Sequence, residues 1–331
     1  MCEVKNLHEK HYSILLVLCP QVCIFIQYWY HELMKTSKAK APLGASLVVL
    51  SSIFYASYGI WTKLMGNFFS GYTASALRSV LVLIMLLPVA VYLKKLQKLD
   101  LKHNLSLLLA LIISSAFIWG PLYYAILHAG IGISLAINYA GIVIGMFFFG
   151  WLFFSEKFTK DKLVSSLLGF IGLAMIFIPG NAQFGWLALG ASALSGFATS
   201  LNMTISKKMT YNATQSTVML WVTSVIANTI MIFIVHEKVP QFSLGTEWLY
   251  LAAFALASVI ASWAFVSGLR KIDAGAAGVL GLLEIVFGVI FGVAFFHEHP
   301  TGLFILGVLV IIVASAIPYI KDYDFDRGTL G

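Results

Sequence analysis

The chain is poor in charged residues and has almost no cysteine. Only 11% of its 331 residues are Asp, Glu, Lys or Arg, too few to solvate the surface of a soluble protein of this length. The cysteines, Cys2, Cys19 and Cys23, all lie near the N-terminus, so the body of the chain holds no disulfide framework and no thiolate metal site. A G-x-x-x-x-G-K-S/T loop is also missing, which excludes direct use of ATP through that motif.

Apolar residues are in excess: 60% of the chain is hydrophobic and its mean hydropathy is +0.91. A bilayer-spanning helix needs about 20 apolar residues, and ten runs come close to that length. The links between them are short, and no soluble domain interrupts them. The sequence therefore predicts an all-α integral membrane protein with ten transmembrane helices, at residues 45–64, 72–93, 105–127, 132–154, 163–179, 184–206, 214–235, 247–269, 275–296 and 302–320.

Lysine and arginine are unevenly distributed between the two sides of these predicted helices. If residues 34–44 are cytoplasmic, only Lys63 and Lys238 of the ten-helix body fall outside, and Arg78 lies near the outer end of the second helix. Cytoplasmic loops carry the excess of Lys and Arg, which predicts that both ends of the body are cytoplasmic and explains the net charge of +7 without nucleic acid. The inner side holds Lys35, Lys38, Lys40, Lys94, Lys95, Lys98, Lys102, Lys157, Lys160, Lys162, Lys207, Lys208, Arg270, Lys271, Lys321 and Arg327.

The two halves of the chain repeat each other. A shift of 142 residues superposes Glu298 on Glu156 and Gly292 on Gly150, each at the end of a run of apolar and glycine residues. Five helices per repeat is an odd number, so the second repeat enters the membrane upside down relative to the first. We therefore expect two inverted five-helix repeats, residues 34–180 and 181–331. This arrangement is typical of secondary transporters, which bind substrate near the membrane midplane between the halves.

Residues 1–33 fit this pattern poorly. Residues 12–30 are apolar enough to enter a bilayer, but Pro20 and Gln21 interrupt them. Three interpretations compete: an additional helix, a signal-like segment, and upstream sequence translated from a misassigned start. No A-x-A-type cleavage site follows, which disfavours the second interpretation. We expect a dispensable extension, with Met34 as an alternative start.

Two apolar runs end in the same way, with FFFGWLFFSE at Glu156 and GVIFGVAFFHE at Glu298. A glycine-bearing helix follows each of them, LLGFIGLAMIFIPG and LGVLVIIVASAIP. With these features, residues 34–321 resemble the EamA-type permeases of the drug/metabolite transporter superfamily. The resemblance implies movement of small metabolites across the cytoplasmic membrane by alternating access. That family often has a proline in the fourth and ninth helices, beside a glutamate in the ninth, and this chain has neither proline.

Glu284 lies about ten residues into the ninth predicted helix, near the bilayer centre. A carboxylate at that depth costs about 3 kcal/mol, so it must face the bundle interior, stay protonated or find a partner. The repeat places it opposite Ile142, so packing alone does not require an acid there. We predict a proton-coupling or substrate-amine site at Glu284; the alternative is a protonated acid bonded to a neighbouring helix.

Other polar residues inside the predicted helices are candidates for contact with the substrate. The guanidinium of Arg78 suits bidentate binding of a carboxylate or phosphate, and its alternative is to snorkel to the outer surface. Asn138 and Tyr139 lie in the fourth helix, the repeat partner of the ninth, so we expect them at the central cavity; helix-to-helix hydrogen bonding is their alternative. Asn202 has the same two uses.

Aromatic residues supply the remaining candidates. Trp119 and Trp263 lie deep in the third and eighth helices, at related positions of the two repeats, and Tyr123 is one turn beyond Trp119. Together with Trp61 and Tyr124 they suit the walls of a cavity for an amphipathic or cationic substrate. Aromatics near helix ends more often anchor a protein at the membrane interface.

These features predict a secondary transporter of the plasma membrane that exports a small organic solute, such as an amino acid or drug-like compound, with proton coupling through Glu284. The alternatives are an importer of the same fold and a membrane-embedded enzyme, which would need a nucleophile–base pair at membrane depth. Residues 297–299, His-Glu-His, are too few for a zinc site, and we expect no metal and no cofactor. The expected partners are the solute and the lipid bilayer. The sequence does not decide whether the protein forms a homodimer, because Gly141 and Gly145 suit helix packing within one chain or between two.

Overall fold

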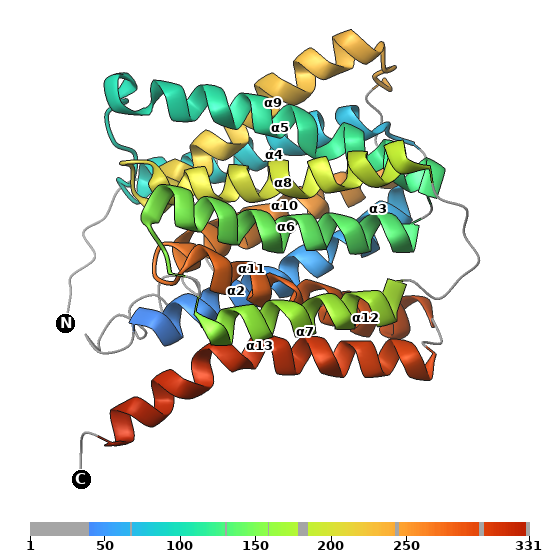
Figure 1. Cartoon of the computed structure of the whole chain (residues 1–331). Helices are drawn as coiled ribbons and strands as arrows, with labels where there is room; N and C mark the ends of the chain where they lie inside the picture. The colour runs from blue at the N-terminus through green and yellow to red at the C-terminus, as the bar shows by residue number, and fades with distance from the viewer. Residues whose placement is uncertain are drawn as a thin grey trace, which may run out of the picture.

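The structure, a computed structural model, describes residues 40–66, 68–129, 131–157, 159–177, 185–241, 245–297 and 301–328. Regular structure within these ranges is entirely α-helical (Figure 1). The expected extension, residues 1–33, lies outside the described residues. The helices are α2 Lys40–Ala56, α3 Tyr58–Met65, α4 Gly71–Tyr92, α5 Leu101–Ala129, α6 Ile131–Phe154, α7 Lys160–Phe177, α8 Trp186–Lys208, α9 Ala213–Val235, α10 Thr246–Leu269, α11 Ala274–Gly281, α12 Leu283–Phe296 and α13 Gly302–Gly328.

Local sequence explains where several of these helices begin and end. Asn212 precedes α9, and its side chain accepts a hydrogen bond from the amide of Gln215, so one of the free amides of the first turn is satisfied. Four residues just beyond a helix adopt the left-handed conformation that commonly ends one, with φ of 52° to 56°: Lys94, Ser155, His236 and His297.

The helices of the two halves interleave in one bundle (Figure 1). From the first half, α4 packs against α9 of the second half, and α7 packs against α13. Helices α5 and α6 flank α8, while α2 packs against α10, α11 and α12. The centre of the bundle is therefore formed by helices of both halves, and buried residues such as Met146, Phe265 and Val279 fill much of it.

Seven helical segments within the described residues are long and apolar enough to cross a membrane, judged by length and composition. Large apolar side chains such as Ile84, Ile113 and Phe233 are more than half exposed on the bundle, as suits contact with lipid. The prediction of an all-α membrane protein is thus confirmed, whereas ten crossings and inverted repeats stay predictions. The seven segments are Ala41–Met65, Gly71–Tyr92, Lys102–Ala125, Ser134–Phe154, Ala213–Val235, Thr246–Leu269 and Ala274–Phe296.

Two of these segments are locally distorted inside the bundle, at Ser57 between α2 and α3 and at Leu282 between α11 and α12. Both residues keep right-handed helical φ and ψ, so each segment continues through its distortion. The amides of Leu282 and Ile285 donate to carbonyls three residues back, which tightens the turn there. The ninth predicted helix is thus distorted although it contains no proline, and Glu284 lies two residues beyond the distortion.

Glycines allow α6 and α8 to approach closely. A Cβ at Gly196 would collide with the carbonyl oxygen of Asn138 and lie 3.0 Å from the Cα of Gly141. A Cβ at Gly145 would collide with the hydroxyl of Ser200. Of the two uses considered for Gly141 and Gly145, the structure has packing within one chain.

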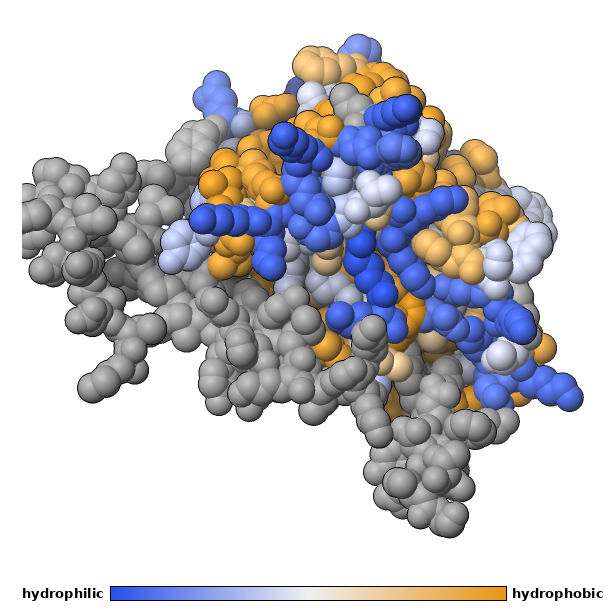
Figure 2. Space-filling view, turned by 90° about the vertical axis from the view of Figure 1, so that its left-hand side faces the viewer, coloured by the Kyte–Doolittle hydropathy of each residue, from blue (hydrophilic) through white to orange (hydrophobic). Residues whose placement is uncertain are grey.

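Hydrophilic side chains stand among apolar ones at one end of the bundle (Figure 2), and the loops and helix ends there carry most of the described basic residues. Hydrogen bonds join the loops at this end. The amide of Asp100 donates to the hydroxyl of Tyr211 at 2.9 Å, and Arg270 donates to the carbonyl of Ser206 at 2.7 Å. The described cations carried by these loops and the adjoining helix ends are Lys94, Lys95, Lys98, Lys102, Lys157, Lys160, Lys162, Lys207, Lys208, Arg270 and Lys271.

An ion pair at this end joins three helices. Glu156, just beyond α6, accepts a hydrogen bond of 2.8 Å from the ammonium of Lys207 on α8. Its carboxylate also accepts the amide of Ala274, the first residue of α11, at 2.8 and 3.0 Å. Lys207 donates in addition to the carbonyl of Ile272 at 2.8 Å. Both charged side chains are mostly buried. This cluster, Glu156, Lys207, Ile272 and Ala274, is called the α6–α8–α11 clasp below.

Candidate functional site

Two cavities adjoin at the centre of the bundle. The larger has a volume of about 130 Å³ and is lined by α2 to α5 of the first half and α8 to α10 of the second. The smaller, of about 30 Å³, is lined by α2, α6, α8 and α10 and by the α11–α12 segment. Tyr55, Met203 and Phe265 line both cavities, so the two share a wall.

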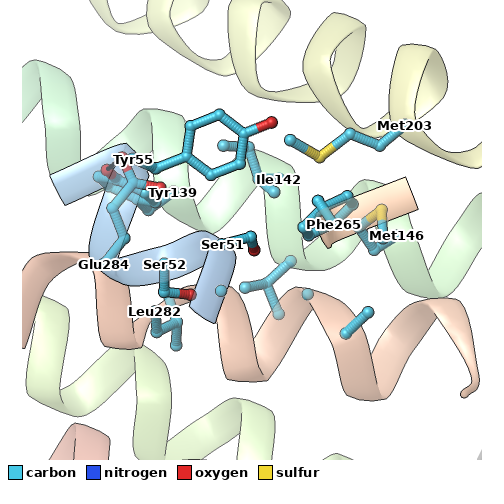
Figure 3. Close-up of a pocket in the computed structure, with 14 residues that line it drawn as sticks. Ser51, Ser52, Tyr55, Tyr139, Ile142, Met146, Met203, Phe265, Leu282 and Glu284 are labelled. Carbon is cyan, nitrogen blue, oxygen red and sulfur yellow. Dashed lines mark hydrogen bonds between the residues drawn. The ribbon is translucent and has the colours of Figure 1, made fainter. Parts of the chain in front are cut away.

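The smaller cavity contains Glu284 (Figure 3). The hydroxyl of Tyr139, from α6, donates to Oε1 of Glu284 at 2.9 Å, and the ring of Tyr55 lies close by. Ser51 and Ser52 also line the cavity, but their hydroxyls donate back to the carbonyl of Val48 at 2.7 and 3.0 Å. No ion pair within the described residues involves Glu284. This carboxyl therefore needs a proton or a cationic group in the cavity to balance its charge.

The larger cavity is built around Arg78. Helix α4 carries this residue into the bundle interior, where only 4% of it is exposed. Aromatic rings surround the guanidinium at distances typical of cation–π contacts. Its Cζ lies 4.4 Å from the ring centroid of Phe254, 4.7 Å from that of Trp119, 5.2 Å from that of Tyr58 and 5.5 Å from that of Trp221.

Rings rather than acids surround Arg78. None of the ion pairs in the described part of the chain involves it, and its Nε is buried without a hydrogen-bond partner. Burying an unpaired charge costs several kcal/mol, and cation–π contacts offset only part of that cost. The alternative considered for Arg78, snorkelling to the outer surface, does not hold, because the residue is buried. Anion binding, the other use considered, stays a prediction.

Three further sequence candidates line the cavities. Trp119 and Asn202 lie at the larger one and Tyr139 at the smaller. Asn202 also donates to the hydroxyls of Ser114 and Ser115 at 3.0 and 2.9 Å, so it links α8 to α5 as well as facing the cavity.

The other three candidates lie away from the linings of both cavities. Asn138 donates to the hydroxyl of Ser195 at 2.9 Å and so ties α6 to α8, the alternative role considered for it. Trp263 donates from its indole nitrogen to the hydroxyl of Thr214 at 3.3 Å. Tyr123 is about half exposed. A role for these three residues in substrate contact stays a prediction.

The sequence did not reveal most of the aromatic rings that surround Arg78 and line the cavities. Tyr55, Tyr58, Trp221 and Phe254 were not selected, because local sequence does not distinguish an aromatic ring that faces a cavity from one that faces lipid. The inner faces of α4 and α8 do carry small polar residues, such as Ser79 and Ser195, but such residues also serve helix packing and so do not identify a cavity wall. The cluster of Tyr55, Tyr58 and Trp61 within one apolar run is a signal that could have found two of these rings.

Ligands for a metal do not converge in the described residues: no group of three or more His, Cys, Asp or Glu side chains there could hold an ion. His297 follows α12 directly. The other two members of the His-Glu-His sequence, Glu298 and His299, lie outside the described residues.

The sequence is similar to those of known transporters. The model of the EamA-like transporter family matches residues 42–178 and 186–319. The riboflavin transporter of Vibrio cholerae serotype O1 is 23% identical over 215 residues, which cover 65% of this chain and 70% of that protein. Solute carrier family 35 member G1 of Mus musculus is 24% identical over 307 residues, covering 84% of this chain and 79% of that protein. One solved crystal structure shares the fold, with a TM-score of 0.71 at 15% identity over 85% of this chain and 98% of the other.

Proposed function

Because the chain belongs to the EamA-like transporter family, we propose that it is a secondary transporter that moves a small organic solute across the membrane by alternating access. One observation carries this proposal. The central cavities are lined by helices of both halves and hold two ionisable side chains, Arg78 and Glu284, inside membrane-spanning segments. Such residues are costly in a membrane, and they commonly mark substrate or ion pathways.

The proposed transporter crosses the membrane ten times, in two inverted repeats of residues 34–180 and 181–331. The family model matches the chain twice, which supports two repeats. The packing supports a two-fold relation, because exchanging the halves reproduces it: α2 packs on α10 as α8 packs on α5, and α4 meets α9, its own counterpart. Rocking one half against the other would open the central cavities to each side in turn.

The basic end of the bundle is proposed to face the cytoplasm, so that both ends of the ten-helix body lie inside a plasma-membrane protein. The uneven distribution of Lys and Arg supports this orientation. Among the described residues, Lys63 and Lys238 lie in the loops and helix ends on the other side. Export is the proposed direction, and an importer of the same fold would use the same cavities.

Glu284 is the proposed proton carrier. Its carboxyl borders a cavity, stands at the start of α12 and has no cationic partner among the described residues. The hydrogen bond from Tyr139 stabilises the ionised form, whereas the apolar surroundings favour the protonated form. A group balanced in this way can change protonation as the cavity opens to one side and then the other.

The direction and the solute can be tested in a bacterial host that expresses the protein. Growth would be measured against a panel of toxic amino acids, organic acids, other metabolites and cationic drugs. Tolerance to one compound class supports export. Increased sensitivity to a class indicates import and would overturn the proposed direction. If no compound changes growth and no panel solute exchanges across proteoliposomes that contain the protein, the transport proposal fails.

Glu284→Gln is expected to abolish accumulation driven by a proton gradient and to leave solute exchange intact. Glutamine can still accept the hydrogen bond of Tyr139, but it cannot carry a proton. With coupling of one proton per solute, a step of one pH unit drives about tenfold accumulation in proteoliposomes, since 1.4 kcal/mol corresponds to a factor of ten. The variant should show none of it. Glu247→Gln, at the start of α10 and outside both cavity linings, is the control. If Glu284→Gln keeps the accumulation, Glu284 is a packing acid and not the carrier.

A further inference from the structure

The larger cavity holds a charge that nothing in the described protein neutralises. From this geometry we propose that the substrate is a small organic monoanion, whose carboxylate binds Arg78 while its apolar or aromatic body packs among the rings of the cavity. The proposal rests on the transport function proposed above and names the substrate class for it.

The sign of the ligand follows from Arg78. Arginine stays protonated in proteins, and this one has a buried Nε without a hydrogen-bond partner and no ion pair within the described residues. A cationic ligand would be repelled by it, and a neutral ligand would leave the charge uncompensated. A carboxylate accepts two parallel hydrogen bonds from the planar fork of the guanidinium. An anion bound to Arg78 therefore offsets the free-energy cost of burying its charge unpaired.

The number of charges follows from the other residues at the cavity. Arg78 is the only cation among its lining residues, and these are otherwise apolar, aromatic, hydroxyl-bearing or amide-bearing. A phosphate monoester carries about 1.5 to 2 negative charges at neutral pH, so part of its charge would stay unpaired in this setting. One guanidinium matches one carboxylate. The site thus favours a monocarboxylate over a phosphate ester or a dicarboxylate.

The size and character of the ligand body follow from the volume and the walls. The cavity of about 130 Å³ is close to the roughly 150 Å³ of an engineered protein cavity that binds benzene. Trp119, Trp221 and Phe265 supply aromatic walls. A single ring or a short branched chain fits such a space. A substrate of this type places its charge at one end, on Arg78, and an apolar group at the other.

Binding to the purified full-length protein in lipid nanodiscs tests the proposal. The probes are benzoate, its neutral isostere benzamide, phenyl phosphate and phenylalanine, each titrated while the thermal unfolding of the protein is followed. Benzoate is expected to raise the unfolding temperature in a saturable way. Benzamide should bind at least about tenfold more weakly, the factor that corresponds to losing one charge-assisted contact. Phenyl phosphate should also bind more weakly than benzoate, because part of its charge stays unpaired in the cavity.

Arg78→Met is the decisive variant, because methionine is unbranched and apolar and removes only the charge and the donors. The variant should lose the response to benzoate, while its unfolding temperature without ligand is unchanged or raised, since an unpaired buried charge has gone. A structural role of Arg78 would instead lower that temperature. Arg78→Lys should retain weak binding, because lysine supplies a charge without the fork. Lys208→Met, which removes an exposed cation from the end of α8, should behave like the wild type.

Several outcomes would overturn the monoanion proposal. These are a benzoate response that persists in Arg78→Met, a response to benzamide as strong as that to benzoate, and binding of phenylalanine or phenyl phosphate in preference to benzoate. The same measurements separate this proposal from the transport function. If proteoliposomes exchange a neutral or cationic solute and benzoate does not compete, the substrate class is wrong and the transporter stands. If benzoate binds but no solute is exchanged, the site stands and the transport proposal falls.

Discussion

Replacing Glu156 by alanine is expected to lower the free energy of unfolding by about 3 kcal/mol, the lower end of the range for removing one partner of a buried ion pair. The change leaves the ammonium of Lys207 buried without its carboxylate and removes the acceptor for the first amide of α11. Both losses fall on the α6–α8–α11 clasp, which joins the two halves of the chain. Titrating the detergent-solubilised protein with denaturant measures this change in the free energy of unfolding.

Lys207 and Lys208 provide matched variants for this prediction. Lys207→Ala should lose nearly as much stability as Glu156→Ala, and the double variant should lose much less than the sum of the two, because the partners are in direct contact. Lys208→Ala, at the next position and exposed, should change stability little. Equal effects of Lys207→Ala and Lys208→Ala, or additive losses in the double variant, would show that the clasp does not stabilise the bundle.

Gly196→Ala is expected to destabilise the protein by about 1–3 kcal/mol, the usual cost of overpacking a well-packed interior. The added Cβ would collide with the carbonyl oxygen of Asn138 and lie 2.9 Å from the amide nitrogen of Ile142. Both are backbone atoms of α6, which cannot rotate away as a flexible side chain can. The two helices must separate, and the contacts along the α6–α8 interface weaken together. Thermal unfolding of the purified variant measures the loss.

Gly190→Ala is the control for this change, in the same helix. Nothing lies within 4 Å of a Cβ at Gly190, and alanine is the better helix former by about 1 kcal/mol. This variant should therefore be as stable as the wild type or more stable. A loss at Gly190 as large as that at Gly196 would mean that flexibility of α8, and not its close contact with α6, explains the glycines.

Only some features of the central cavities could be predicted from the sequence. Glu284 and Arg78 could be selected from the sequence, because a charged residue inside a long apolar run is costly and therefore needs a special environment. The environment itself could not be predicted. Tyr139 lies 145 positions from Glu284, and the partners of Arg78 come from α3, α5, α9 and α10. No local pattern encodes such distant contacts.

Glycines and polar residues on the helices illustrate the same limit. From the sequence, Gly141 and Gly145 could serve helix packing within one chain or between two. In the structure both glycines lie against α8 of the same chain. The sequence offered Asn138 both as a substrate contact and as a link between helices, and the structure shows the link to Ser195. In each case one residue has two physically sensible uses, and the neighbouring helix supplies the partner for one of them.

The sequence by itself determined that this is a helical membrane protein, because long apolar runs with few charges have a stable solution only as hydrogen-bonded helices in lipid. It also identified Arg78 and Glu284 as charged residues inside those helices. Only the tertiary structure decided which rings surround Arg78, that Glu284 contacts Tyr139, and that the ninth predicted helix is distorted at Leu282 without a proline. The physical reason is that hydrophobicity sets the length and the solvent of these helices, whereas their orientation depends on close packing with partners far away in the chain.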